Sequence, residues 1–271
     1  MEKYELNKDN YYSLDANKAY MSVSQFKDFV KCEAYALAKV NGEWEDEKTD
    51  ALLIGAYVDS FFAGEFVEFK ETHPEIFNSR TGELKSQYAK ADDLIIAITG
   101  DKMLYDFLKG KHQEIYTGEI VGVPFKGKFD SDFDDMIVDG KVMKDMLPVW
   151  VENEQGRNVK VSFIKAYGYD TQGAVYQELK RQRTGKVVPF VLDVITKEKV
   201  PSKALIQLEQ EDMDIALEQV KELAPRYQRI KLGLEKPHYC GKCDYCKSIM
   251  KVDHISSSKE FEPIDYSKES E

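Results

Sequence analysis

The stretch Gly127-Lys-Phe-Asp130-Ser-Asp-Phe-Asp-Asp-Met-Ile-Val-Asp139-Gly-Lys141 decides the fold of this chain. It predicts two β-strands joined by a turn, with Asp130 at the end of the first strand and Asp139 and Lys141 on the second. Residues two apart on a strand point to the same face, so Asp139 and Lys141 project together. The preceding Ile137-Val138 pair indicates a buried strand, where charges persist only when they are paired or bound to a metal.

Two carboxylates that converge from adjacent strands suit a hard divalent cation such as Mg²⁺. A nearby lysine would then hold or activate an attacking water and stabilise charge on a phosphate. The spacing alone leaves an alternative open, because Asp-x-Lys is a common tripeptide. In that alternative, the acidic residues 132, 134 and 135 belong to a hairpin turn, and Asp139 and Lys141 form a surface pair.

The rest of the chain predicts one mixed α/β domain without internal repeats. Helical patterns precede residue 114, short β-prone runs follow, and further helices and strands complete the domain. The predicted helices are 22–32, 49–64, 84–98, 101–109, 162–183 and 212–232, and the predicted strands are 114–121, 123–132, 136–141, 187–195 and 204–209. We expect an irregular lead-in at 1–20, a folded domain at 21–250 and a disordered acidic tail at 251–271.

The composition is that of a globular protein: 42% of the 271 residues are hydrophobic and 32% are charged. This excludes collagen, a low-complexity scaffold and wholesale disorder. The net charge of −11 argues mildly against binding nucleic acid through bulk charge, although it leaves room for a local basic groove. The sequence shows neither an apolar run of about 18 residues nor a secretory signal, so we expect a cytoplasmic protein without a membrane span.

The order Gly-x-x-Asp, hairpin, hydrophobic run and Asp-x-Lys resembles the core motif of PD-(D/E)XK nucleases. Further along, Gln172 and Tyr176 are four residues apart on one helical face. They resemble the Gln-x-x-x-Tyr helix of the RecB-type branch of that superfamily. Upstream, Ser22-Val-Ser24 with Phe26 and Cys32 resembles its entry helix.

Over residues 20–250 the chain is similar to phage-encoded RecE-like exodeoxyribonucleases that act in recombination. This resemblance implies a restriction-endonuclease-like β-sheet flanked by helices. It also implies a Mg²⁺- or Mn²⁺-dependent DNA exonuclease with 5′-phosphate products, acting in recombination or repair. A single-strand annealing protein would be a possible partner, and a homo-oligomer a possible working form.

The resemblance assigns roles residue by residue. Asp130, Asp139 and the carbonyl of Gly140 would hold the metal, and Lys141 would position the nucleophilic water. Gln172 and Tyr176 would orient Lys141 or the DNA backbone. Ile54-Gly-Ala-Tyr-Val-Asp59 resembles the second motif, in which many relatives carry a histidine ligand where this chain has Asp59. An aspartate can also bind a hard cation, so Asp59 is a further candidate ligand, with a solvated helix residue as the alternative.

The four cysteines form a second candidate site. Three of them make Cys240-x-x-Cys243-x-x-Cys246, and Cys32 lies far upstream. Clustered cysteines in a cytosolic protein indicate metal ligands rather than disulfides. This spacing suits an iron–sulfur cluster with a remote fourth thiolate, and it resembles the [4Fe–4S] staple of some RecB-type nucleases. We therefore expect a [4Fe–4S] cluster that holds the segment 236–250 against the N-terminal helix.

Other interpretations stay open. A four-cysteine zinc site is the alternative at this second site, and it is also possible that the trio binds nothing, or binds zinc with His238. His112 shows no ligand spacing and is expected on the surface or in a loop. The basic run 180–186 is expected to be a solvated helix end, or a phosphate contact if the chain is a nuclease. For the whole chain, a non-catalytic DNA-binding or assembly protein is the alternative function.

Overall fold

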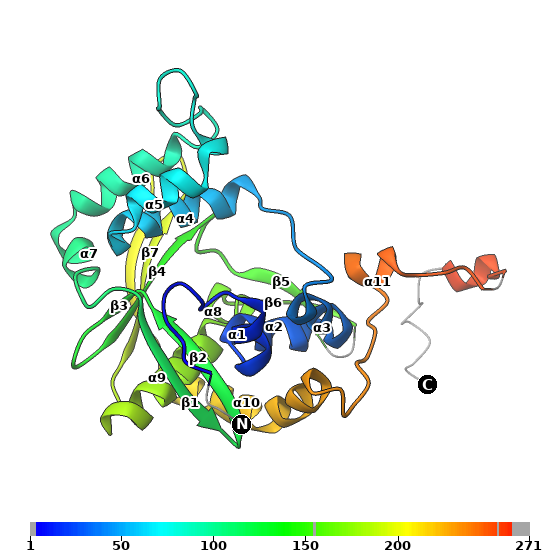
Figure 1. The fold of residues 1–271 in the computed structure, drawn as a ribbon. Helices are drawn as coiled ribbons and strands as arrows, with labels where there is room; N and C mark the ends of the chain where they lie inside the picture. Colours follow the sequence, from blue (N-terminus) through cyan, green and yellow to red (C-terminus); the bar gives the residue numbers. More distant parts are fainter. Residues whose placement is uncertain (1–3, 154–155, 254, 262–271) are drawn as a thin grey trace, which may run out of the picture.

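The computed structural model describes residues 4–153, 156–253 and 255–261 (Figure 1). The α-helices are α1 (Leu14–Ala19), α2 (Val23–Lys31), α3 (Glu33–Asn41), α4 (Asp50–Ala63), α5 (Phe66–Thr72), α6 (Lys90–Thr99), α7 (Lys102–Phe107), α8 (Phe163–Ala166), α9 (Tyr169–Thr184), α10 (Gln210–Lys231) and α11 (Asp244–Ser248). Two short 3-10 helices are η1 (Pro74–Ile76) and η2 (Ser258–Phe261). The strands are β1 (Glu114–Ile120), β2 (Val123–Phe129), β3 (Ser131–Asp132), β4 (Ile137–Met143), β5 (Val149–Glu152), β6 (Asn158–Val161), β7 (Phe190–Thr196) and β8 (Lys203–Gln207).

The central sheet has the strand order β3-β4-β7-β8. Its inner strands β4 and β7 run parallel, and β7 is buried along its whole length, as the apolar run Phe-Val-Leu predicts for an inner parallel strand. β1 and β2 form a separate antiparallel hairpin, and Asp130 alone separates β2 from β3. The chain therefore passes from the hairpin into the central sheet at Asp130.

Helices cover the sheet on both sides and form two apolar cores (Figure 1). One core joins α4, α6 and α7 to Ile195 of β7. The larger core joins α2, α9 and α10 to the β1–β2 hairpin and to Phe190 of β7. This arrangement confirms the predicted α/β class, a mixed sheet flanked by helices.

Local sequence explains where the helices near the site begin. Ser22 caps α2, because its hydroxyl accepts a hydrogen bond from the backbone N–H of Gln25, and Thr49 caps α4 in the same way. Gly64 ends α4 in the left-handed conformation. Both helices therefore lie where the sequence places them, although the apolar side chain of Val30 on α2 is exposed.

Several expectations about local structure are corrected. The lead-in is not irregular throughout, because Ser13 caps α1 at residues 14–19. The helix expected at 162–183 is divided, because Gly168 adopts the left-handed conformation between α8 and α9. The helix expected at 84–98 begins only at Lys90, and α3 and the β5–β6 hairpin have no predicted counterpart.

Part of the expected tail, at 254 and 262–271, lies outside the described residues. Within the described parts of the chain, no helix combines the length and the apolar character needed to cross a membrane.

Candidate active site and cysteine cluster

Asp130 and Asp139 converge as their strand positions predict. The carboxylate of Asp130 accepts a 3.1 Å hydrogen bond from the backbone N–H of Gly140 on β4. Asp139 is 1% exposed, and its Oδ1 accepts a 2.7 Å hydrogen bond from Nε2 of Gln172 on α9. Burial raises the pKa of Asp130 well above its usual range, and the nearby carboxylates of Asp139 and Asp59 raise it further.

Lys141 forms an ion pair with the second oxygen of Asp139, so the two side chains share one face of β4 as predicted. The Nζ atom also lies 5.4 Å from the centre of the Tyr169 ring. Burial alone would lower the pKa of Lys141, but Asp139 and Asp130 outweigh that effect and raise it. Lys141 is therefore a cation at neutral pH, and the surface-pair alternative for Asp139 and Lys141 does not fit their burial.

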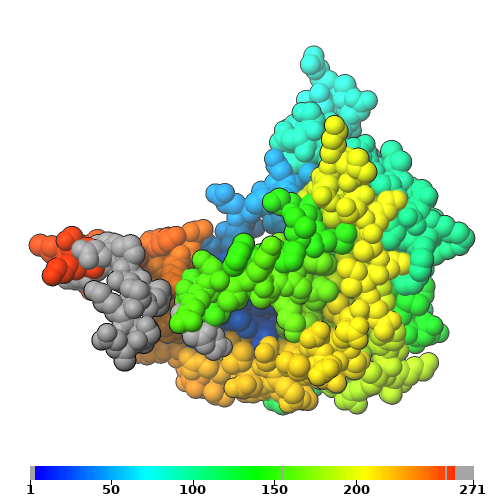
Figure 2. All heavy atoms as spheres, turned by 180° about the vertical axis from the view of Figure 1, so that it is seen from behind, coloured from blue at the N-terminus to red at the C-terminus, as the bar shows by residue number. Residues whose placement is uncertain are grey.

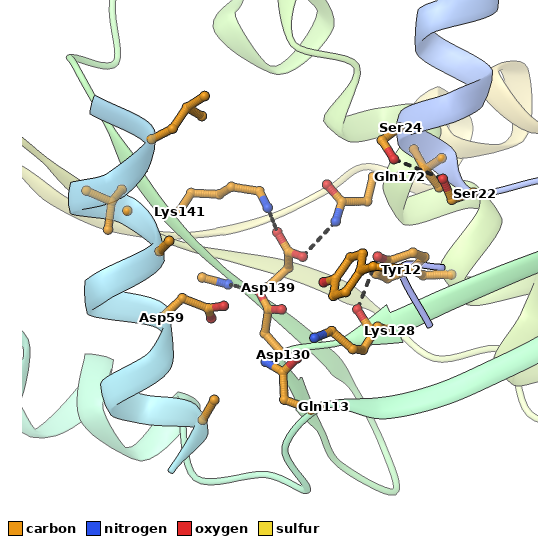
Figure 3. A pocket seen from close by; sticks show the side chains of 18 of the residues that line it. Tyr12, Ser22, Ser24, Asp59, Gln113, Lys128, Asp130, Asp139, Lys141 and Gln172 are labelled. Carbon is orange, nitrogen blue, oxygen red and sulfur yellow. Dashed lines mark hydrogen bonds and ion pairs between the residues drawn. The ribbon is translucent and has the colours of Figure 1, made fainter. Parts of the chain in front are cut away.

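Asp59 faces the two strand carboxylates from α4, and Figure 3 shows all three carboxylates pointing into one space. Protein atoms surround the carboxyl group of Asp59 on several sides, but the side chain remains exposed to solvent through the open part of this space. Burial raises the pKa of Asp59, although Lys128 and Lys141 favour its charged form. Three carboxylates gathered in this way repel one another unless a cation or protons neutralise them, so the all-oxygen donor set fits a hard divalent cation.

Gln172 and Tyr176 both face the site from α9, but they do different things. Gln172 contacts Asp139, whereas the Tyr176 hydroxyl donates a 3.2 Å hydrogen bond to the backbone carbonyl of Lys128. The ring of Tyr176 stacks on Phe129, with 4.5 Å between the ring centres. In this structure Gln172 therefore orients an acidic residue, and Tyr176 fixes strand β2 rather than Lys141.

These residues line a cavity of about 600 Å³ between the two apolar cores. Its wall includes basic and hydroxyl side chains that sequence spacing did not single out as site residues, among them Lys27, Lys128 and His112. Lys27 donates to the carbonyl of Tyr167 at 3.0 Å, and the His112 ring contacts the carbonyl of Asp130 at 3.1 Å. His112 lies in the turn before β1, as expected of a loop residue, and its ring also lines the cavity. These side chains come from three different elements, so the sequence holds no spacing signal for them.

The basic run 180–186 is not a solvated helix end throughout, because Lys180 is 2% exposed. Its Nζ pairs with Asp132 at 2.5 Å and donates to the carbonyls of Phe133 and Met136. Tyr116 also donates to Asp132, at 2.7 Å. Lys180 therefore anchors the turn that leads into β4 and is not free to contact a phosphate.

The four cysteines come together as predicted, with all their Sγ atoms within 4.8 Å of one another. Cys32 lies at the corner between α2 and α3, and the trio lies on the segment that ends in α11. Among the described residues, this group contains no histidine. The backbone carbonyl of His238 contacts Cys32, which does not support His238 as a ligand.

The cysteines of this cluster shift one another's pKa values. Although burial opposes ionisation, backbone N–H groups of Cys243 and Lys242 lower the pKa of Cys240 to about 6. Burial and the neighbouring sulfurs raise the pKa of Cys243 to about 12, despite a hydrogen bond from the N–H of Cys246. Four crowded thiols cannot all ionise without a cation, so the cluster has the donor set and the electrostatics of a metal site.

The fold and the acidic site define a PDDEXK-like protein. Residues 22–249 match the sequence family described as "PDDEXK-like domain of unknown function (DUF3799)", and the chain belongs to that family. The chain is also similar to a solved structure from Eubacterium rectale named a "Putative exonuclease". The two are 40% identical, the match covers 95% of this chain and 98% of the other, and the TM-score is 0.88. No curated protein matches the chain.

Proposed function

We propose that this protein is a metal-dependent DNA exonuclease that leaves 5′-phosphate products. The observation that carries the proposal is the convergence of Asp130, Asp139 and Lys141 in the wall of one cavity, with Gln172 bonded to Asp139. Membership of a PDDEXK-like family and the similarity to the Eubacterium rectale protein support the nuclease class.

The metal-binding residues in this proposal are Asp130, Asp139 and the carbonyl of Gly140, with Asp59 as a further ligand. In a strand, the N–H and C=O of one residue point to the same edge. Since the N–H of Gly140 bonds Asp130, its carbonyl lies on the edge that Asp130 occupies. Bound there, Mg²⁺ or Mn²⁺ would polarise the scissile phosphate and lower the pKa of a water.

Lys141 contributes positive charge. Because its raised pKa keeps it protonated, it donates hydrogen bonds and does not act as a general base at neutral pH. A divalent cation bound to Asp139 would neutralise the carboxylate. The ammonium group of Lys141 would then be available to hold the attacking water and to stabilise charge on the phosphate. Gln172 keeps the carboxylate of Asp139 in one orientation during these events.

The cavity wall supports DNA as the substrate. Lys27 and Lys128 bring positive charge to the cavity despite the acidic net charge of the chain, and they are placed for phosphate contacts. Tyr12 also lines the cavity and is 70% exposed, so its ring is available to stack on a base (Figure 3). The resemblance to recombination exonucleases supports work in recombination or repair inside the cell, with an annealing protein as partner and an oligomer as the working form.

The direct test uses end-labelled linear DNA and covalently closed circular DNA, each with Mg²⁺, with Mn²⁺ or without added cation. We expect release of 5′-phosphorylated products from linear DNA only, and only with a cation. Asp139→Asn and Lys141→Ala should each lower the rate on the order of 10²-fold or more.

Matched controls are Asp134→Asn and Lys144→Ala, because these side chains are 90% and 91% exposed. Both should retain full activity. Tight DNA binding by the unmodified protein without cleavage under any of these conditions would replace the proposal with a non-catalytic DNA-binding role.

A further inference from the structure

The spacing of the four sulfur atoms distinguishes between the two metal centres that the cysteine pattern allows, a single zinc ion and a [4Fe–4S] cluster. The Sγ atoms of Cys32 and Cys246 are 3.6 Å apart, those of Cys240 and Cys246 are 3.9 Å apart, and no pair exceeds 4.8 Å. A tetrahedral zinc ion with Zn–S bonds of about 2.3 Å holds its sulfur atoms about 3.8 Å apart. A [4Fe–4S] cube places four iron atoms between the thiolates and holds their sulfurs roughly 6 Å apart or more.

We infer that this site binds one structural zinc ion through Cys32, Cys240, Cys243 and Cys246, and that it does not hold a [4Fe–4S] cluster. The sulfurs fit a single tetrahedral ion with small adjustments. To admit a cube, every pair would have to separate by more than an ångström. Cys32 connects α2 to α3, whereas Cys240 lies in the loop before α11, Cys243 caps α11 and Cys246 lies within it.

The backbone around the trio is arranged to stabilise metal-bound thiolates. Cys240 Sγ accepts hydrogen bonds from the N–H groups of Lys242 and Cys243 at 3.4 and 3.3 Å, and Cys243 Sγ accepts one from Cys246 at 3.5 Å. Gly241 adopts a positive φ of 68°, which lets the chain turn tightly between the first two cysteines. The loop thus folds back on its own sulfurs and stabilises their thiolate form, which a metal ion requires of its ligands.

The position of the site indicates what the zinc stabilises. Cys32 marks the corner where α2 ends and α3 begins, and α2 carries Lys27 into the catalytic cavity. Next to Cys32, Glu33 pairs with Arg226 at 2.7 and 2.9 Å and accepts from the N–H of His238 at 2.7 Å. The zinc and this ion pair therefore attach the C-terminal segment to the helix corner behind the cavity wall.

A second attachment joins the same segment to the back of the molecule. Lys242 pairs with Glu152 of β5 at 2.7 Å, and Figure 2 shows the green β5–β6 hairpin extending toward the orange C-terminal region. Lys242 donates its backbone N–H to the sulfur of Cys240, whereas its ammonium group is hydrogen-bonded to Glu152. Its side chain therefore offers a matched control within the loop that separates Cys240 from Cys243.

The test is the metal content of full-length protein expressed with ample iron and zinc and purified without oxygen. We expect about one zinc per chain, negligible iron and no brown colour. Replacement of zinc by Co²⁺ should give the visible spectrum of tetrahedral cobalt–thiolate coordination. Cys243→Ser and Cys32→Ser should each lose most of the zinc, whereas Lys242→Ala should retain it.

Two results would overturn the inference: brown protein containing iron and sulfide, or metal-free protein with the four thiols free or oxidised. Metal content does not depend on the proposed nuclease activity, so the two proposals fail separately. If Cys243→Ser fails to fold, the cobalt spectrum of the unmodified protein still decides between one tetrahedral ion and an iron–sulfur cube.

Discussion

Gln172 on α9 donates a 2.7 Å hydrogen bond to Asp139 on β4, although 33 residues separate them in the sequence. Asp139 also pairs with Lys141, so its two oxygens are held by an amide and by an ammonium group. A carboxylate fixed on both sides has one orientation available for a metal. The bond therefore connects the helix of the larger core directly to the candidate catalytic strand.

Replacing Gln172 by alanine should weaken metal binding more than it weakens folding. Asp139 would lose the group that orients it, so the Mg²⁺ concentration for half-maximal DNA cleavage should rise about 10-fold or more. A Mg²⁺ titration of the initial cleavage rate measures this shift. Gln172→Glu should be worse, since it places another carboxylate against Asp139.

Gln177→Ala is the matched control on the same helix. Gln177 is buried and bonds the carbonyl of Val188 and the side chain of Gln210, away from the carboxylates. This variant should lose stability and keep the Mg²⁺ dependence of the unmodified protein. If both variants shifted the Mg²⁺ dependence equally, Gln172 would have no orienting role.

Replacing Lys180 by methionine should strongly destabilise the fold. The change leaves Asp132 buried without its cation, and removing one partner of a buried ion pair costs about 3–5 kcal/mol. Urea unfolding measures the loss in the free energy of unfolding. The double variant Lys180→Met with Asp132→Asn should recover part of it, because no uncompensated charge stays buried.

Lys186→Met tests whether this effect belongs to Lys180 alone. Lys186 is exposed in the same basic run, so its replacement should change the free energy of unfolding by less than about 0.5 kcal/mol. Equal stability of the two lysine variants would show that the pair of Lys180 and Asp132 does not hold the turn.

The parts of the site that sequence reasoning predicted depend on local rules. Strand alternation places Asp139 and Lys141 on one face, and the chain leaves β2 at Asp130, so these three residues were predictable without knowledge of the fold. The close approach of Cys32 to the trio came instead from family resemblance. The structure brings these cysteines together, and their sulfur spacing is the ground on which we infer zinc in place of the iron–sulfur cluster that the pattern suggested.

The parts that sequence reasoning did not predict depend on contacts between distant elements. Lys180 looks like any lysine in a basic run, and only the fold places Asp132 against it. His112 and Lys27 reach the cavity from segments without a shared spacing. Gly168 divides one predicted helix into α8 and α9, and α8 has only four residues, too few for helical periodicity to mark it as a separate helix.

Gly127→Ala should destabilise the protein through Tyr176. A Cβ atom at residue 127 would lie 2.9 Å from a ring carbon of Tyr176 and 3.1 Å from one of Phe129. Because these rings are buried and stacked, neither can move freely, and we expect the free energy of unfolding measured in urea to fall by about 1–3 kcal/mol.

Gly55→Ala is the matched control, since the added Cβ would meet Val142 at 4.0 Å, an ordinary contact. It should be neutral or stabilise α4 by about 0.5–1 kcal/mol, and a larger loss there than at Gly127 would contradict the packing argument.

Asp193 should make the stability of the protein depend on pH. It is 3% exposed, and its Oδ2 has no hydrogen-bond partner within the described part of the chain. Burial raises its pKa from 3.8 to about 7, with a smaller contribution from Asp101. Between these two values the native state binds a proton that the unfolded state has released, so the free energy of unfolding falls as the pH rises from about 4 to about 7.

Asp193→Asn removes this titration, because an amide does not ionise. Urea unfolding across that pH range, without added Mg²⁺, gives the free energy of unfolding at each pH. In the variant, this free energy should fall less steeply with pH, by up to about 1.4 kcal/mol per pH unit. The variant should match the unmodified protein most closely near pH 4 and exceed its stability above pH 7, where the unmodified protein has a buried charge at Asp193. Asp134→Asn, at an exposed position, should leave the slope unchanged. An unchanged slope in Asp193→Asn would mean that Asp193 is already ionised at low pH in the folded protein, with a partner for its charge.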